Sequence, residues 1–120
     1  VELIDARTVK PLDAGTIIRS VQKTGRLIVC DTSWIQFGVS AEISSVVCEN
    51  AFKYLKAPII RIGLPDCPTP CSYSLEKAFY PDHLDIIEAL KKVLSGEKAR
   101  TLRSFRVKKI LEVDTFRGPF

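Results

Sequence analysis

Two carboxylates, Asp31 and Asp66, lie at the ends of apolar runs that have the pattern of buried strands, residues 26–31 and 59–64. Two acids that converge at one edge of a sheet could share general acid–base chemistry, one giving and one taking a proton. Acids at strand ends more often cap loops by accepting hydrogen bonds from backbone N–H groups. Capping is therefore favoured, and no residue is assigned as catalytic.

The other reactive side chains are sparse: four cysteines (Cys30, Cys48, Cys67 and Cys71) and one histidine, His83. Cys30 lies in a predicted strand and Cys48 on the apolar side of a predicted helix, so both are expected to be small buried hydrophobic residues. Cys67 and Cys71 flank three residues, two of them proline, whereas zinc sites usually show tighter pairs repeated twice. Neither a metal site nor a nucleophilic centre is predicted.

The sequence has no GxGxxG run and no phosphate loop. Gly38 precedes a predicted helix whose first N–H groups could hold an anion, but one glycine is weak evidence. Charge is uneven, because residues 91–120 hold 9 Lys and Arg against 3 Asp and Glu, while residues 1–90 hold 9 against 11. This basic tail fits an electrostatic arm or, with more weight, a solvated terminus. Nucleic acid is not expected as a partner.

These residues are positioned by strands that alternate with helices. Strands are expected at Val1–Ala6, Arg26–Asp31 and Ile59–Leu64, with helices near residues 14–24, 40–55 and 82–95. Alternation of this kind predicts a three-layer, Rossmann-like α/β fold with a mainly parallel sheet. We expect a domain over residues 1–96 and a basic tail over 97–120, in which residues 105–113 fit an edge strand or a short helix equally well.

The helices carry recognisable ends and apolar faces. Asp13 is a good N-cap for the first helix, and Gly25 should stop it. In the last helix, Pro81 and Asp82 stand at the start and Gly96 at the end. The residues expected to pack inward along that helix are Leu84, Ile87, Leu90 and Leu94.

Two loops after successive strands are expected to form one contact surface. Prolines at 65, 68 and 70 make the second loop stiff, so that little entropy remains to be lost on docking. The first loop, residues 32–38, holds three large apolar residues that should be partly exposed. The predicted interface residues are Trp34, Ile35, Phe37, Pro65, Asp66, Pro68 and Pro70.

Composition is that of an ordinary globular domain, with 46% hydrophobic and 27% charged residues in 120 and a net charge of +4. No apolar run approaches the roughly 20 residues of a membrane helix. No signal segment opens the sequence, so a cytoplasmic location is expected. Val1 has no leader and the chain has no Met, so its start is interpreted as a cut within a larger protein and Phe120 as a natural end.

Four motifs in order resemble the transketolase C-terminal domain. They are residues 1–13 (VELIDARTVKPLD), 24–29 (TGRLIV), 38–43 (GVSAEI) and 65–81, which hold PDCPTP, LEK and a later proline. The family counterparts are VEVIDLRTLRPLD, TGRLVVV, GxxAEI and PDxPTP…LEK…P. The closest version is that of the beta subunit of thiamine-diphosphate-dependent 2-oxo acid dehydrogenases, of the pyruvate, branched-chain or acetoin type.

The resemblance implies a role in assembly. In such enzymes thiamine diphosphate and Mg are held between the alpha subunit and the amino-terminal half of the beta subunit. The C-terminal domain resembled here supports contacts with that cofactor half, the alpha subunit and a second beta subunit, and docking on the acyltransferase core of multienzyme complexes. This chain is therefore expected to hold no cofactor and to be inactive alone. The alternative is a free-standing anion-binding or regulatory module that uses the Gly38 helix start and the basic tail.

The chain departs from the family pattern in two places. The family domain has a further strand and helix before the equivalent of Val1, and that strand lies inside the sheet. Residues 1–120 must therefore fill a gap or pair with another copy. Cys71 stands where an aromatic residue is usual and Cys67 where a small apolar one is common.

Overall fold

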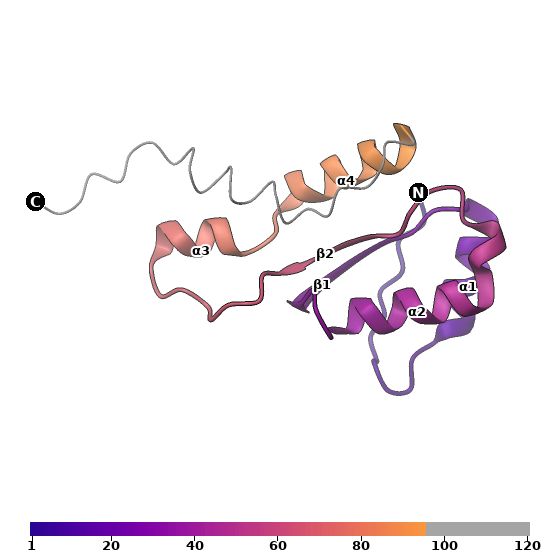
Figure 1. Cartoon of the computed structure of the whole chain (residues 1–120), viewed down its shortest axis with the longest axis horizontal. Helices are drawn as coiled ribbons and strands as arrows, with labels where there is room; N and C mark the ends of the chain where they lie inside the picture. Colours follow the sequence, from indigo (N-terminus) through magenta and orange to yellow (C-terminus); the bar gives the residue numbers. More distant parts are fainter. Residues whose placement is uncertain (96–120) are drawn as a thin grey trace, which may run out of the picture.

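A two-stranded parallel sheet lies at the centre of the molecule (Figure 1). The computed structural model describes residues 1–95. The two strands of the sheet pair from Ile28, opposite Ile60, to Trp34, opposite Leu64, with a register shift after Cys30. The elements in chain order are α1 (Ala14–Thr24), β1 (Ile28–Trp34), α2 (Val39–Ala51), a 3₁₀ turn (Phe52–Tyr54), β2 (Ile60–Leu64), α3 (Tyr73–Phe79) and α4 (His83–Ser95).

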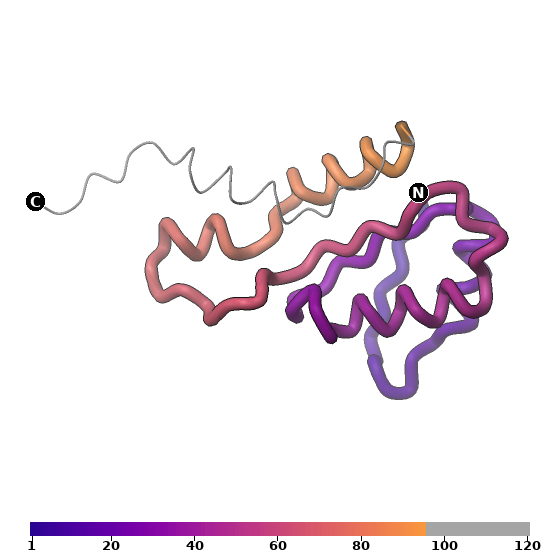
Figure 2. Tube along the Cα trace, viewed as in Figure 1, coloured from indigo at the N-terminus to yellow at the C-terminus, as the bar shows by residue number. Residues whose placement is uncertain are grey.

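Helices pack on both faces of this sheet. On one face α1 and α2 form an apolar core with β1, made of Ile17, Val21, Val29, Ile43, Val47 and Ala51. On the other face Ile60 and Ile62 of β2 pack against Ala89 and Val93 of α4. Figure 2 shows the chain running from β2 through the proline loop to α3 and back along α4. The predicted α/β class with parallel strands is confirmed.

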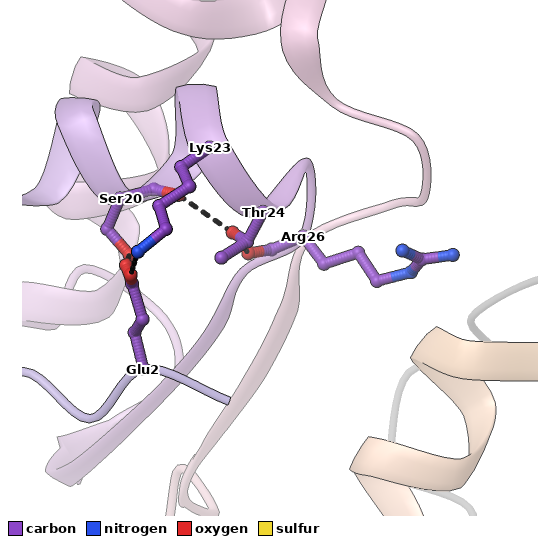
Figure 3. A network of polar contacts seen from close by, with 5 residues as sticks. All are labelled: Glu2, Ser20, Lys23, Thr24 and Arg26. Atoms are coloured by element: carbon purple, nitrogen blue, oxygen red, sulfur yellow. Dashed lines mark hydrogen bonds and ion pairs between the residues drawn. The ribbon is translucent and has the colours of Figure 1, made fainter.

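The predicted strand Val1–Ala6 is wrong, because this segment has no regular structure and pairs with no strand in residues 1–95. A strand needs a neighbour whose backbone N–H and C=O groups complete its hydrogen bonds. Instead the segment is held on α1 through the side chain of Glu2 (Figure 3). The Glu2 carboxylate accepts a hydrogen bond of 2.6 Å from Ser20 Oγ and forms an ion pair with Lys23. The sheet has two described strands, not three.

Helix α1 forms as its ends predicted. The Asp13 carboxylate accepts a hydrogen bond from the Thr16 N–H, and Gly25 closes the helix at a φ of 71°. At this left-handed φ a glycine carries no steric cost.

Helix α2 is shorter than expected, since its regular turns stop at Ala51 and the last expected turn tightens into the 3₁₀ segment. Both helices bury apolar side chains on their inner faces, at Ile17, Val21, Ile43 and Val47.

The predicted inward face of α4 is also wrong. Leu84, Ile87 and Leu94 are exposed, and Leu90 is only partly buried. The buried positions are Asp85, Ala89 and Val93, spaced four residues apart on an adjacent face. The apolar arc of α4 is wider than one contact can cover, and small side chains let the helix approach β2 most closely.

The start of α4 follows the prediction. Asp82 Oδ1 accepts hydrogen bonds from the N–H groups of Leu84 and Asp85, and the Asp85 carboxylate accepts one from the Asp82 N–H. This reciprocal arrangement satisfies backbone donors that the first turn of a helix leaves unpaired.

Further corrections concern short elements and cysteines. Helix α3 was not predicted, although it buries Ala78 and Phe79. Cys30 and Cys48 are exposed, not buried. The α4 cluster reaches β1 at Ile28 and does not cover Cys30, and Cys48 lies outside the face that α2 packs inward. No helix within residues 1–95 is long and apolar enough to span a membrane. The expected basic tail, including residues 105–113, lies outside the described residues.

Candidate functional site

The two predicted loops meet at the carboxyl end of the sheet. A shallow hollow there is lined by side chains from both, with Trp34, Phe37 and Asp66 among them. The other lining residues are Thr32, Ser33, Gln36, Gly38 and Leu64. The structure therefore brings together three of the predicted interface residues. Parallel strands place their carboxyl ends at the same edge, which is why the sequence could anticipate this meeting.

An irregularity in β1 sets the position of Trp34. The register shifts between Cys30, opposite Ile62, and Trp34, opposite Leu64, so that three residues of β1 face Gly63 alone. A Cβ atom on Gly63 would lie 2.9 Å from the Ser33 carbonyl oxygen, so only glycine lets the bulged strand come this close. A bulge redirects the strand that contains it, and here Trp34 follows it with 53% of its surface exposed.

The turn after Trp34 is fixed by two hydrogen bonds to β2, one from backbone to backbone and one from a side chain. The Ile35 N–H donates to the Leu64 carbonyl oxygen at 3.1 Å, and Arg61 Nη1 donates to the Ile35 carbonyl oxygen at 3.0 Å. Phe37 adopts a φ of 58°, a left-handed conformation that costs an aromatic residue free energy. Its side chain is nevertheless fully exposed. A strained residue that presents an aromatic ring to solvent suggests a role in contact.

Gly38 ends this turn and starts α2. A Cβ atom at Gly38 would lie 2.1 Å from the Trp34 carbonyl oxygen and 2.4 Å from Ser33 Oγ. The turn between β1 and α2 therefore requires glycine for a steric reason. The family-like GxxAEI run begins at this residue because the chain packs against itself here.

The remaining predicted interface residues lie around the same edge. Ile35, Pro65 and Pro70 are partly buried, while Pro68 is exposed. The partial exposure expected for this loop is confirmed, since Trp34 and Phe37 are exposed and Ile35 is half-buried. Their role in an interface stays a prediction.

Asp31 and Asp66 do not form an acid–base pair in the manner considered from the sequence. Asp31 lies inside β1 rather than at its end, and its carboxylate accepts hydrogen bonds from the N–H, at 3.1 Å, and the Oγ of Ser33. It thereby fills a backbone role in the bulge, as capping acids do. Asp66 lines the hollow.

Two carboxylates lie near the start of α2, the helix end that the anion-binding alternative would use. Glu42 lies in the first turn of α2, and Asp66 lines the hollow that includes Gly38. Negative side chains near a helix N-terminus take the favourable position that an anion would otherwise occupy. Ser40 Oγ is buried and has no hydrogen-bond partner within residues 1–95, but Ser40 does not line the hollow.

The described residues contain no cluster of three His, Cys, Asp or Glu side chains that could hold a metal ion. The four cysteines are free and exposed. Neighbouring atoms desolvate the Cys30 thiol enough to raise its pKa, so it is less often a thiolate than an ordinary cysteine.

Comparison with known proteins identifies the family. The family model described as transketolase, C-terminal domain, matches residues 1–86. The chain belongs to the transketolase C-terminal domain family. The resemblance inferred from the four motifs is thus confirmed.

Similar curated proteins are pyruvate dehydrogenase E1 component beta subunits. The one from Rickettsia felis is 50% identical over 92 residues, covering 77% of this chain and 28% of the relative. The one from Bacillus subtilis is 42% identical over 93 residues, covering 78% and 28%. The mitochondrial subunit of Saccharomyces cerevisiae is 45% identical over 97 residues, covering 80% and 26%. This transketolase C-terminal domain thus spans little more than a quarter of the length of these relatives.

Sequence reasoning missed the feature that shapes the site in this domain. The bulge in β1 was not predicted, although two signals marked it: Gly63 inside an apolar strand, and Asp31 two residues before Ser33. A glycine within a strand often marks a close approach of a neighbouring backbone, and an Asp with a serine two residues later often forms a local hydrogen-bonded turn.

Proposed function

We propose that this chain is an assembly domain of a larger thiamine-diphosphate-dependent 2-oxo acid dehydrogenase of the beta-subunit type, and that it has no catalytic activity alone. The relatives named pyruvate dehydrogenase E1 component subunit beta support this class of parent enzyme. The partners proposed are the cofactor-binding amino-terminal half, the alpha subunit, a second beta subunit and the acyltransferase core. Which 2-oxo acid is the substrate is set by parts outside this chain.

One observation carries the proposal: two exposed aromatic rings stand at one edge of the sheet, beside a stiff proline loop. Trp34 and Phe37 line the same hollow as Asp66. Exposed aromatic residues on a rigid frame are typical of contact surfaces, because they bury a large area on docking and lose little entropy. Trp is also among the residues that most often dominate binding energy.

Thiamine diphosphate and Mg do not fit the hollow beside Trp34 and Phe37. A diphosphate needs cations or converging N–H groups, and Mg²⁺ is usually held by carboxylates together with phosphate oxygens. The hollow offers Asp66 as its one carboxylate and no cationic side chain. The cofactor is therefore assigned to the parent enzyme and not to this domain.

The test is Trp34→Ala in the full-length protein that contains this domain. Subunit assembly, measured by sedimentation velocity, should weaken by about 2 kcal/mol, roughly thirtyfold in dissociation constant. Turnover per assembled enzyme should be unchanged. Phe52→Ala is the matched control, because Phe52 is exposed but lies outside the hollow. Unchanged assembly with lost turnover would place the loop in the active site and refute the proposal.

A second measurement separates this proposal from the anion-binding or regulatory module. The 120-residue chain is titrated calorimetrically with thiamine diphosphate, inorganic phosphate and nucleotides. The assembly proposal expects no saturable heat. Saturable micromolar binding of any of the three would favour the alternative, with the Gly38 helix start as the first site to mutate.

The predicted cytoplasmic location stays a prediction; some relatives carry the word mitochondrial in their names.

A further inference from the structure

An open groove of about 830 Å³ runs between α2 and the start of β2. All of its lining residues lie between positions 41 and 61, in α2, the 3₁₀ turn and the first part of β2. On α2 they form a stripe through Ala41, Ser44 and Cys48, beside the stripe that packs inward at Ile43 and Val47. The groove is thus built entirely within one continuous stretch of the chain.

The walls of the groove are mainly apolar. Phe52, Leu55 and Ile59 supply its large side chains, and Phe52 is 71% exposed. A concave surface that is mostly apolar and carries a few polar groups at fixed positions is typical of a binding site. What the groove binds is therefore set by its few polar groups.

Two cations and no carboxylate line the groove. The cations are Lys56 and Arg61, and within residues 1–95 neither of them forms an ion pair. Glu49 accepts a hydrogen bond of 3.3 Å from Ser45 Oγ but does not line the groove. Positive charge that has no carboxylate partner beside an apolar surface favours a ligand with negative charge.

The two cations are held toward opposite ends of the sheet. The Lys56 N–H donates to the Gly25 carbonyl oxygen at 2.8 Å, and Gly25 comes before β1. Arg61 Nη1 donates to the carbonyl oxygen of Ile35, which directly follows β1. A guanidinium has five N–H donors, so this bond holds Arg61 in place and leaves donors for a ligand. A ligand that meets both cations must therefore be elongated.

We propose that this groove binds an extended acidic segment of a partner protein, with carboxylates at both ends of a short apolar stretch. One carboxylate pairs with Lys56 and the other with Arg61, while the apolar residues between them pack on Phe52. The basic tail of this chain has the same sign of charge as the groove, which disfavours the tail as the occupant.

This partner is separate from the subunit contact proposed for Trp34 and Phe37, because neither of those residues lines the groove. Phe52→Ala therefore remains a control for subunit assembly, although it should weaken binding in the groove.

Alkylation of the 120-residue chain by iodoacetamide, followed by mass spectrometry, measures whether the groove is occupied. Cys48 lines the groove and Cys67 does not, while both are free and exposed, so the chain carries its own control. The probe is the synthetic peptide ESALVASE, blocked at both ends. At saturation it should slow alkylation of Cys48 roughly fivefold or more, because a bound segment excludes the reagent, and leave Cys67 unchanged.

Charge variants of peptide and protein test the two ion pairs. The peptides KSALVASK and QSALVASQ keep the apolar centre and should give at most about half the protection of Cys48. Lys56→Gln should raise the dissociation constant of ESALVASE about threefold, as expected for one exposed ion pair. Lys53→Gln is the matched control, because Lys53 is an exposed cation nearby in the chain that does not line the groove; it should have a smaller effect.

Four results would overturn the proposal. They are unprotected Cys48 at millimolar ESALVASE, equal protection by the lysine peptide, and a Lys56→Gln variant that binds like the wild type. The fourth is alkylation of Cys48 that is slow in the free chain and speeds up on dilution, which would assign the groove to a second copy.

Discussion

The side chain of Arg26 donates a hydrogen bond of 3.0 Å from Nε to the backbone carbonyl oxygen of Val93, joining residues 67 positions apart. Val93 lies in the last turn of α4, where carbonyl groups have no partner within the helix. A positive charge is also favoured at this end of a helix. Arg26, two residues before the start of β1, thus ties the α1 and α2 layer to the helix on the opposite face.

Replacing Arg26 should loosen α4. Arg26→Met keeps most of the aliphatic stem and removes the donor, so the free energy of unfolding should fall by about 1–2 kcal/mol. Arg19→Met is the control, because Arg19 is exposed and, within residues 1–95, donates a side-chain hydrogen bond only to Thr16, one turn away. Its effect should be under about 0.5 kcal/mol. Urea unfolding followed by circular dichroism measures both, and equal losses would contradict the bridging role.

Neighbouring residues of α4 should respond differently to truncation. Val93 is buried against β2, so Val93→Ala should cost about 1–2 kcal/mol through lost packing. Leu94 is exposed, and Leu94→Ala should change the free energy of unfolding by less than about 0.5 kcal/mol. The sequence-based face predicts the reverse order, so the same urea measurements decide between the two faces.

Local rules predicted α1 well because its two ends carry their own signals. The Asp13 cap and the Gly25 stop act within a few residues, so no distant partner is needed to form them. The meeting of the loops at Trp34 and Asp66 was also predictable, since parallel strands dictate it. Recognition of the family rested on sequence motifs. For one of them, the GxxAEI run, the structure shows a steric reason for its glycine, Gly38.

Where a feature depends on a partner, the sequence pattern misled. The alternation in Val1–Ala6 states that these residues can form a strand, but not whether a neighbouring strand is present to pair with them. The wide apolar arc of α4 fits several packing faces, and contact with Ile60 and Ile62 selects the one through Ala89. The Cys30 prediction failed for the same reason, because covering of a sheet face is a property of the whole fold.

Gly38 and Gly15 should differ in the sign of their response to alanine. Gly38→Ala would place a Cβ atom against the Trp34 backbone, so the free energy of unfolding should fall by about 2 kcal/mol or more. A Cβ atom at Gly15 meets only the flexible ends of Arg19 and Asp13, at 3.3 and 3.6 Å. Gly15→Ala should therefore be neutral or stabilising by about 0.5–1 kcal/mol, as alanine favours the helix. A tolerated Gly38→Ala would show that the turn relaxes.

The attachment of the first segment to α1 should depend on pH at both extremes. A hydrogen bond from Lys23, and a weaker effect of the one from Ser20, hold the pKa of Glu2 below its usual value. Glu2 in turn raises the pKa of Lys23. The attachment is therefore fully present above the unfolded-state pKa of Glu2 and is lost as pH falls through its lowered pKa. On the alkaline side it is lost as pH rises through the raised pKa of Lys23. Near neutral pH it should be constant.

An NMR titration of the Glu2 carboxyl carbon, together with the Ser20 and Lys23 amide shifts, measures this attachment. Glu2→Gln is the control, since it should remove the acid transition from both amides. If Glu2 titrates at or above the usual pKa of a glutamate, the segment is not held on α1 in solution.

Phe37 should prove to be kept for contact at the expense of stability. Asparagine tolerates the left-handed conformation at φ 58° far better than phenylalanine, and the exposed ring of Phe37 has little burial to lose. Phe37→Asn should therefore raise the free energy of unfolding of the 120-residue chain by about 0.5–1 kcal/mol.

In the full-length protein the same change should weaken subunit assembly, because the Phe37 ring lines the proposed contact surface. Phe52→Asn is the control, because Phe52 is an exposed aromatic residue with an ordinary helical φ of −50°. It should neither raise the free energy of unfolding nor weaken assembly. Urea unfolding and sedimentation velocity give the two readouts. A loss of stability in the isolated chain would mean that the Phe37 ring packs locally, and assembly that is unaffected would remove Phe37 from the interface.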